Sequence, residues 1–154
     1  MKLVLMRHAE AFDALQNPDR PLTSEGRDDA ARMGRMLAET GWAWKELRSS
    51  PVIRARETAE IVAPILNVGV QIEQTLEPGC SYRSIASLLR PEENSSARLF
   101  VLHMPDIAVI AGELLGLPAD RMFFSPGSAI GINLAGPNRP EGMLIFQYQP
   151  GLLA

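Results

Sequence analysis

The chain has 154 residues, a formal net charge of −3 and 46% hydrophobic residues. This length suits one domain, residues 1–154, and the mildly acidic charge gives no reason to expect a nucleic-acid partner. The single cysteine, Cys80, excludes an internal disulfide and is compatible with a reducing compartment. The apolar start at residues 3–6 is too short for a signal peptide or a membrane span, so we expect a cytoplasmic protein without membrane contact.

The first half of the chain predicts two strands, each followed by a helix. An apolar run at residues 2–6 predicts a buried strand. Capping oxygens and apolar residues on one helical face predict a helix over residues 23–40. A short strand is expected at 46–49. A helix over 51–66 follows, with Ser50 as its N-cap, because proline suits the first turn of a helix.

The second half repeats this alternation. Helices are expected over 81–89 and over 105–115, the latter closed by Gly116. The turn-rich segment 135–142 predicts a loop between the last two strands. The strands of this half are expected at 68–73, 98–103, 129–134 and 143–147. The whole pattern predicts an α/β fold with three layers, a mostly parallel central sheet with helices on both faces.

Each of the two histidines directly follows an apolar run. His8 comes after residues 3–6 and Arg7, and His103 comes after residues 99–102. In open α/β sheets the ligand-binding groups gather at the carboxyl ends of the strands. Both histidines are therefore candidate site residues.

Three motifs, in this order, resemble those of the histidine phosphatase superfamily. The first is Arg-His-Ala at residues 7–9, with a Leu-Thr-Ser-Glu-Gly helix start at 22–26. The second is Ser-Pro-Val-Ile-Arg-Ala-Arg-Glu-Thr at 50–58, and the third is His-Met-Pro at 103–105. The short chain and the Arg-Pro-Leu-Thr element at 20–23 are most similar to the SixA-like branch, the small phosphohistidine phosphatases.

This resemblance implies a phosphoglycerate mutase-like fold and a phosphatase that needs no metal or other cofactor. It assigns the nucleophile, which is transiently phosphorylated, to His8, and a hydrogen bond to the phosphoryl group to His103. The physical chemistry of Arg7 and Arg54 agrees, because adjacent guanidinium groups disfavour a protonated imidazole. The same two groups would bind phosphoryl oxygens through charge-assisted hydrogen bonds and stabilise the transition state.

Two further positions have a functional and a structural interpretation. Arg20 would either line the phosphate entrance or form an ion pair with Asp19 or Glu25, and we favour the ion pair. Ser128 lies in a Gly-Ser-Ala sequence that resembles a turn beside the pocket of related small phosphatases. An ordinary turn explains Ser128 equally well.

Glu77 is the candidate general acid, since many members of the superfamily place a carboxylate after the third strand. SixA-like chains generally lack a clear equivalent. A phosphohistidine releases imidazole, whose conjugate acid has a pKa of about 6.5, so an acid is less critical than for an alkoxide leaving group.

Cys80 stands where relatives often carry Gly-Asp, so the loop 77–83 is expected to differ at the substrate entrance. The thiol itself is expected to be packed rather than reactive.

We therefore expect hydrolysis of phosphohistidine on a protein partner, because the loops after the strands are short and leave an open pocket. The alternative is the same chemistry on a small phosphorylated metabolite. A non-catalytic phosphate-binding module is disfavoured because Arg7, His8, Arg54 and His103 are all present. Mutase activity is disfavoured because phosphoglycerate mutases typically have longer chains.

Overall fold

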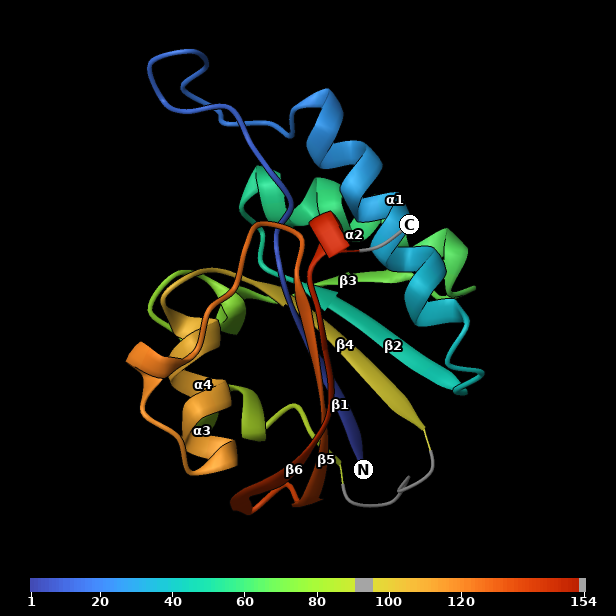
Figure 1. Cartoon of the computed structure of the whole chain (residues 1–154), viewed down its shortest axis with the longest axis vertical. Coiled ribbons are helices and arrows are strands. Elements are labelled where there is room, and N and C mark those ends of the chain that lie inside the picture. The colour runs from blue at the N-terminus through green and yellow to red at the C-terminus, as the bar shows by residue number, and fades with distance from the viewer. Residues whose placement is uncertain (91–95, 153–154) are drawn as a thin grey trace.

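A six-stranded sheet forms the centre of the computed structural model, which describes residues 1–90 and 96–152 (Figure 1). The elements are β1 (Lys2–Arg7), α1 (Ser24–Ala38), β2 (Trp44–Ser49), α2 (Ile53–Ile65), β3 (Val70–Ile72), η1 (Gln74–Leu76), α3 (Tyr82–Ala86), β4 (Ala97–Leu102), α4 (Asp106–Leu115), η2 (Ala119–Arg121), β5 (Ala129–Gly136), β6 (Arg139–Tyr148) and η3 (Pro150–Leu152). The strand order is β3-β2-β4-β1-β5-β6. The first four strands are parallel, and β5 and β6 are antiparallel. The predicted α/β class with a mostly parallel sheet is confirmed.

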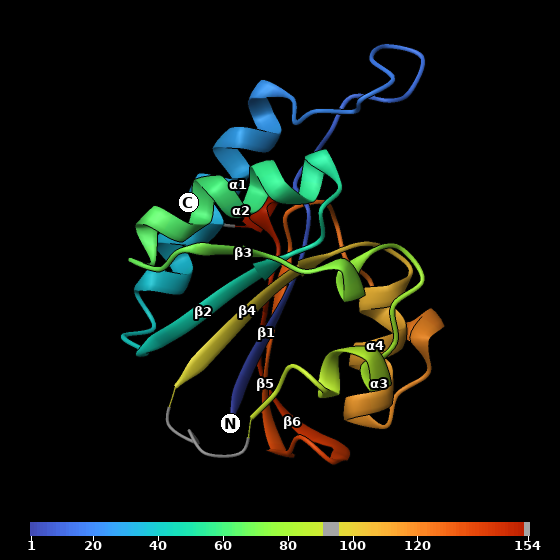
Figure 2. The same cartoon turned by 180° about the vertical axis from the view of Figure 1, so that it is seen from behind.

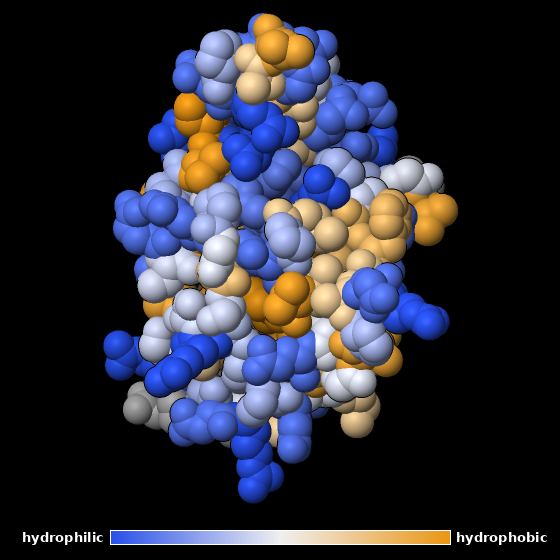
Figure 3. Space-filling model, turned by 90° about the vertical axis from the view of Figure 1, so that its left-hand side faces the viewer, coloured by the Kyte–Doolittle hydropathy of each residue, from blue (hydrophilic) through white to orange (hydrophobic). Residues whose placement is uncertain are grey.

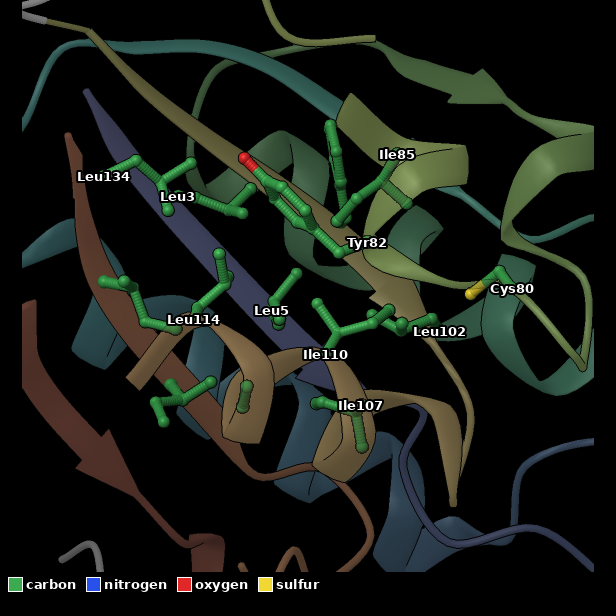
Figure 4. Close-up of a cluster of buried hydrophobic side chains, with 14 of the residues drawn as sticks. Leu3, Leu5, Cys80, Tyr82, Ile85, Leu102, Ile107, Ile110, Leu114 and Leu134 are labelled. Atoms are coloured by element: carbon green, nitrogen blue, oxygen red, sulfur yellow. The ribbon is translucent and has the colours of Figure 1, made fainter. Parts of the chain in front are cut away.

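Helices cover the sheet on both faces, with α1 and α2 on one side and α3 and α4 on the other (Figures 1 and 2). Successive residues of a strand point to opposite faces, so the central strands supply a separate apolar cluster to each helix layer. In β4, Leu99 and Val101 belong to the cluster under α1 and α2. Phe100 and Leu102 belong to the cluster under α3 and α4, part of which Figure 4 shows. Burial on both faces explains the unbroken apolar runs of these strands.

The pairing of β1 with β4 places the two histidines next to each other. These neighbouring strands are parallel, and Arg7 lies opposite Leu102 in the register. His8 and His103 are the next residue on each strand. Ser49, the last residue of β2, lies opposite Val101 on the other side of β4, so three chain segments emerge at one edge of the sheet.

The start of α2 differs from the prediction. The helix begins at Ile53 with Val52 at the N-cap position, which has no side-chain capping bond, so the predicted N-cap at Ser50 is wrong. The Ser50 hydroxyl accepts a hydrogen bond from the Val52 amide at 3.3 Å, but it lies before the helix and serves another contact, described below. By contrast, Thr23 caps α1 as expected, accepting from the Gly26 amide.

Two other predicted boundaries are wrong. The helix expected over 81–89 spans only Tyr82–Ala86. The turn expected between the last two strands is present and forms a hairpin, but it is shorter than 135–142, because β5 continues to Gly136 and β6 begins at Arg139, leaving two residues as the turn. The Tyr82 hydroxyl donates a hydrogen bond to the Pro137 carbonyl at 3.0 Å, so α3 helps hold this hairpin in place.

The surface bears hydrophobic residues in separate patches among hydrophilic ones on the face that Figure 3 shows. Within residues 1–90 and 96–152, no helix is both long and apolar enough to cross a bilayer.

Gly26 in the first turn of α1 provides a test of how this helix meets the loop after β1. A Cβ at Gly26 would collide with the backbone carbonyl oxygen of Glu10. Gly26→Ala should therefore lower the unfolding free energy by about 1–3 kcal/mol, although alanine is the better helix former. Urea denaturation measures this change. Gly69→Ala is the matched control because its Cβ would meet nothing within 4 Å, and equal stabilities of the two variants would contradict the packing.

Candidate active site

His8 is held with one ring nitrogen bound to the backbone and the other facing a guanidinium group. Its Nδ1 lies 2.8 Å from the carbonyl oxygen of Ala9. A carbonyl oxygen only accepts hydrogen bonds, so Nδ1 carries the ring proton and Nε2 has the lone pair. The Nε of Arg54 donates to Nε2 at 3.2 Å. The backbone is fixed too, because the His8 amide donates to the Leu102 carbonyl at 3.1 Å.

His103 differs from His8 in which ring nitrogen is bound to the protein and which is left without a partner. Its ring centre lies 5.3 Å from that of His8, and its Nε2 lies 2.8 Å from the Ser50 hydroxyl oxygen. Among the described residues Nε2 is the acceptor within reach of the Ser50 hydroxyl, so we assign the hydroxyl hydrogen to Nε2. The proton of His103 is then on Nδ1, which is buried and has no hydrogen-bond partner among the described residues. A buried donor without a partner is suited to an anionic ligand.

Both imidazoles are held neutral. The pKa of His8 is lowered to about 3, mainly by burial, with the charges on Arg54, His103 and Arg7 adding to the effect. The hydrogen bond to the backbone carbonyl acts in the opposite direction. Burial also lowers the pKa of His103 to about 4, with contributions from Arg54, Arg20 and Arg7. At neutral pH the His8 Nε2 lone pair is therefore available for attack.

Three arginines converge on the two histidines. Arg7 donates from Nη1 to the Phe124 carbonyl at 2.7 Å, while its buried Nε has no partner in the described part of the chain. Arg54 lies in the first turn of α2. Burial lowers the pKa of both side chains, and the nearby charge of Arg20 contributes in each case. The three guanidinium groups repel one another, so binding of an anion between them would be favourable.

The expected ion pair of Arg20 is wrong. The Nε of Arg20 donates instead to the Phe12 carbonyl at 3.0 Å, and within the described residues Arg20 has no ion pair with Asp19 or Glu25. Its backbone has a φ of 49°, the left-handed region, which turns the loop at this point. The charge of Arg20 lowers the pKa of His103, Arg7 and Arg54, so its guanidinium lies near the candidate site.

Thr58 connects the nucleophile loop to α2, a role that the sequence analysis missed. Its hydroxyl oxygen accepts from the Ala9 amide at 3.0 Å and donates to the Arg54 carbonyl at 2.8 Å. The side chain is fully buried. The available signal was its place at the end of the second motif, four residues after Arg54, where one helical turn brings it to the same face.

Ser128 supports the site through its backbone. The Arg7 amide donates to its carbonyl oxygen at 2.9 Å, and its own hydroxyl donates to the Ser125 carbonyl at 2.6 Å. The hydroxyl hydrogen is therefore used within the turn. Gly127 has a φ of 79° there, and its amide donates to the His8 carbonyl at 2.9 Å.

Glu77 is exposed, and in the described residues its carboxylate has no hydrogen bond or ion pair. The loop that follows it is attached to the start of α4, because Asp106 accepts from the Gly79 amide at 2.7 Å. The Cys80 thiol lies 3.9 Å from the same carboxylate oxygen, at the edge of the apolar cluster (Figure 4). Burial, and next the charge of Asp106, raises the pKa of this thiol to about 11, so it remains protonated.

Two cavities of the described part of the chain lie elsewhere, and neither histidine lines them. One of about 290 Å³ lies at the β5–β6 hairpin, and one of about 320 Å³ lies beside η3. The candidate site is therefore defined by its converging side chains.

The depressed histidine pKa values predict how stability depends on pH. Between the unfolded pKa of about 6.5 and the folded values, the unfolded chain binds more protons, so stability present above pH 6.5 is lost on acidification. Each histidine should contribute up to about 1.4 kcal/mol per pH unit. Urea denaturation between pH 7.5 and 5.5 measures the slope. His8→Gln should have the shallower slope, and equal slopes would show that His8 is not held neutral.

Comparison with known proteins gives the same assignment as the motifs. The model of the histidine phosphatase superfamily (branch 1) matches residues 3–78. An uncharacterised protein of Picosynechococcus is 34% identical over 113 residues, covering 70% of this chain and 68% of that protein. Phosphohistidine phosphatase SixA of Escherichia coli is 28% identical over 119 residues, covering 74% of each chain.

Solved structures extend the likeness beyond the matched segment. The protein histidine phosphatase SixA complexed with tungstate has a TM-score of 0.84 and 25% identity, covering 98% of both chains. This coverage includes β4 and His103, which lie outside the family match. Motif order, site geometry and these relatives agree, and the chain therefore belongs to the histidine phosphatase superfamily.

Proposed function

We propose that this chain, as one domain over residues 1–154, hydrolyses phosphohistidine carried by a protein partner, without a metal ion or other cofactor. The observation that supports the proposal most is the proton arrangement of the two buried imidazoles. His8 presents a lone pair at Nε2, and His103 presents an unpartnered N–H at Nδ1. The likeness to SixA proteins supports phosphohistidine as the substrate class.

In the first step the Nε2 lone pair of His8 attacks phosphorus. A P–N bond to His8 forms as the P–N bond to the substrate imidazole breaks, and that imidazole leaves with the electron pair. Arg7 and Arg54 bind the phosphoryl oxygens, so Arg54 exchanges its contact with Nε2 for the ligand. His103 donates from Nδ1. The His8 Nδ1–H stays bound to the Ala9 carbonyl, which stabilises the positive charge on the phosphorylated ring.

In the second step water attacks the phosphorylated His8. The P–N bond to His8 breaks, inorganic phosphate leaves, and Nε2 regains its lone pair. The guanidinium groups supply the positive charge that a metal ion supplies in other phosphoryl-transfer sites. Arg20 adds charge at the entrance, and Ser128 acts through its carbonyl on Arg7.

A protein substrate is supported by the loop between β1 and α1. This loop spans residues 8–23, so the expectation of short loops after the strands is wrong here. It projects beyond the rest of the molecule (Figure 1) and exposes Leu15 almost completely, with Phe12 partly exposed. Arg20, at the end of the same loop, donates to the Phe12 carbonyl, which connects the exposed apolar side chains to the charged site. A large partner can contact this loop while its phosphohistidine reaches His8.

The substrate class is tested by parallel turnover of a phosphohistidine peptide, a histidine-phosphorylated protein domain and an aryl phosphate, each with a chelator present. Wild type should prefer the two phosphohistidine substrates, with the protein domain hydrolysed fastest. His8→Ala should lose turnover of all three. Glu77→Gln should resemble wild type, because imidazole leaves without strong acid catalysis.

Glu39→Gln, which changes another exposed carboxylate at the C-cap of α1, is the matched control for Glu77→Gln. Efficient aryl ester cleavage that collapses only in Glu77→Gln would overturn the proposal. It would identify instead a phosphatase of small metabolites with Glu77 as its acid.

Ser50 is proposed as a positioning residue for His103. Ser50→Ala removes the donor to Nε2, so the ring can shift its proton to that nitrogen, and kcat on phosphohistidine should fall about tenfold. Long-range proton–nitrogen spectra of the imidazole report which nitrogen carries the proton. Ser49→Ala is the matched control, since this buried hydroxyl donates only to the Ser50 carbonyl. An unchanged ring spectrum in Ser50→Ala would contradict the assignment.

A further inference from the structure

A second concentration of positive charge lies at the opposite end of the sheet from the histidines. A cavity of about 180 Å³ is lined by four basic side chains and one acidic one: Lys45, Arg48, Arg90, Arg98 and Glu46. Arg98 and His103 are five residues apart along β4 and its end, which separates these two residues by roughly 16 Å along the strand. The two regions are therefore separate.

Arg98 is the unusual residue of this cavity. Its side chain is only 1% exposed, although it carries a full charge. Its Nε lies 3.2 Å from a carboxylate oxygen of Glu46, which is close enough for an ion pair. The geometry of this contact does not meet the requirements of a hydrogen bond, so the Nε–H has no hydrogen-bond partner among the described residues. Its Nη1 has no hydrogen-bond partner in the described part of the chain. A buried guanidinium normally has partners for its N–H groups, because water is not available to solvate them.

Two carboxylates of the described residues, Glu46 and Glu73, form ion pairs with the arginines of the cavity. Glu46 is shared, since its other oxygen lies 3.0 Å from Arg48. Arg48 also binds Glu73 at 3.1 Å, so two carboxylates serve two arginines. Arg90 adds a further charge at the cavity and has no ion pair among the described residues. Among the described residues, the cavity therefore combines the Arg90 guanidinium, which has no ion pair, with the unpartnered buried Nη1 of Arg98.

The strand pattern explains why these groups meet. Glu46 and Arg98 lie opposite each other in the register of β2 and β4, so their side chains emerge on the same face of the sheet. Leu99, the next residue, points into the cluster under α1 and α2, so Arg98 faces the side of α3.

We propose that this cavity is a second anion site, which takes a phosphate dianion either free or as the phosphoryl end of a small monoester. Arg98 would donate from Nη1, and Arg90 would close over the ligand from the exposed side. Guanidinium groups bind tetrahedral oxyanions through paired N–H groups. The volume equals that of about six liquid waters, enough for phosphate with little else. The proposal is independent of the reaction at His8.

Calorimetric titration of the full chain with inorganic phosphate tests the site. Wild type should bind two phosphates per chain. Arg54→Ala, which weakens the site at the histidines, should retain one. Arg98→Met and Arg90→Gln should each lose the phosphate at the cavity lined by Arg98 and keep the one at the histidines. The affinity of the cavity for phosphate should fall about tenfold or more in each variant.

Arg90→Gln keeps the test valid if Arg98→Met fails to fold, because Arg90 is exposed. Arg121→Gln, an exposed arginine of η2, is the matched control and should bind two phosphates. Titration of His8→Ala with glycerol 3-phosphate separates the sources: tighter binding than phosphate indicates a monoester, and weaker binding indicates free phosphate. A single phosphate per wild-type chain, lost in Arg54→Ala, would overturn the proposal.

Discussion

The parallel pairing of β1 with β4 is the constraint on which the rest of the site depends. Arg7 lies opposite Leu102, so the chain leaves both strands at the same level, and the next residues are His8 and His103. A register shift of one residue would reverse which face each side chain occupies. Because both strands are buried on both faces, such a shift would move each side chain into a space shaped for a different one, which is costly in a closely packed core. The packing of the core therefore fixes the distance between the two imidazoles.

Burial then determines the chemistry of the paired histidines. An imidazole beside three guanidinium groups already resists protonation, and removal from water strengthens this effect. The backbone decides which nitrogen has the lone pair in His8, through the Ala9 carbonyl. A side chain, Ser50, decides it in His103. Two histidines in nearly the same surroundings thus present opposite groups to one ligand, a lone pair and an N–H.

The same strands carry charge at both of their ends. β4 has the buried Arg98 as its second residue and is followed by His103, and β2 has Glu46 as its third residue and is followed by Ser50. Carboxylates hold the Arg48 guanidinium in ion pairs, one from Glu46 within β2 and one from Glu73, which follows β3. At the carboxyl end, backbone carbonyls such as that of Phe124 hold the arginines. Neutral acceptors fix a guanidinium without cancelling its charge, which leaves it available to an anion.

The sequence by itself determined the α/β class, the strand-end positions of both histidines and the three motifs of the family. Apolar runs and helical spacing are local, so they can be read along the chain. Only the tertiary structure decided that Ser50 contacts His103 rather than capping α2, and that the Arg20 guanidinium lies near the candidate site instead of pairing nearby. These contacts join residues up to 53 positions apart. They depend on strand order and register, which come from packing of the whole core rather than from any local pattern.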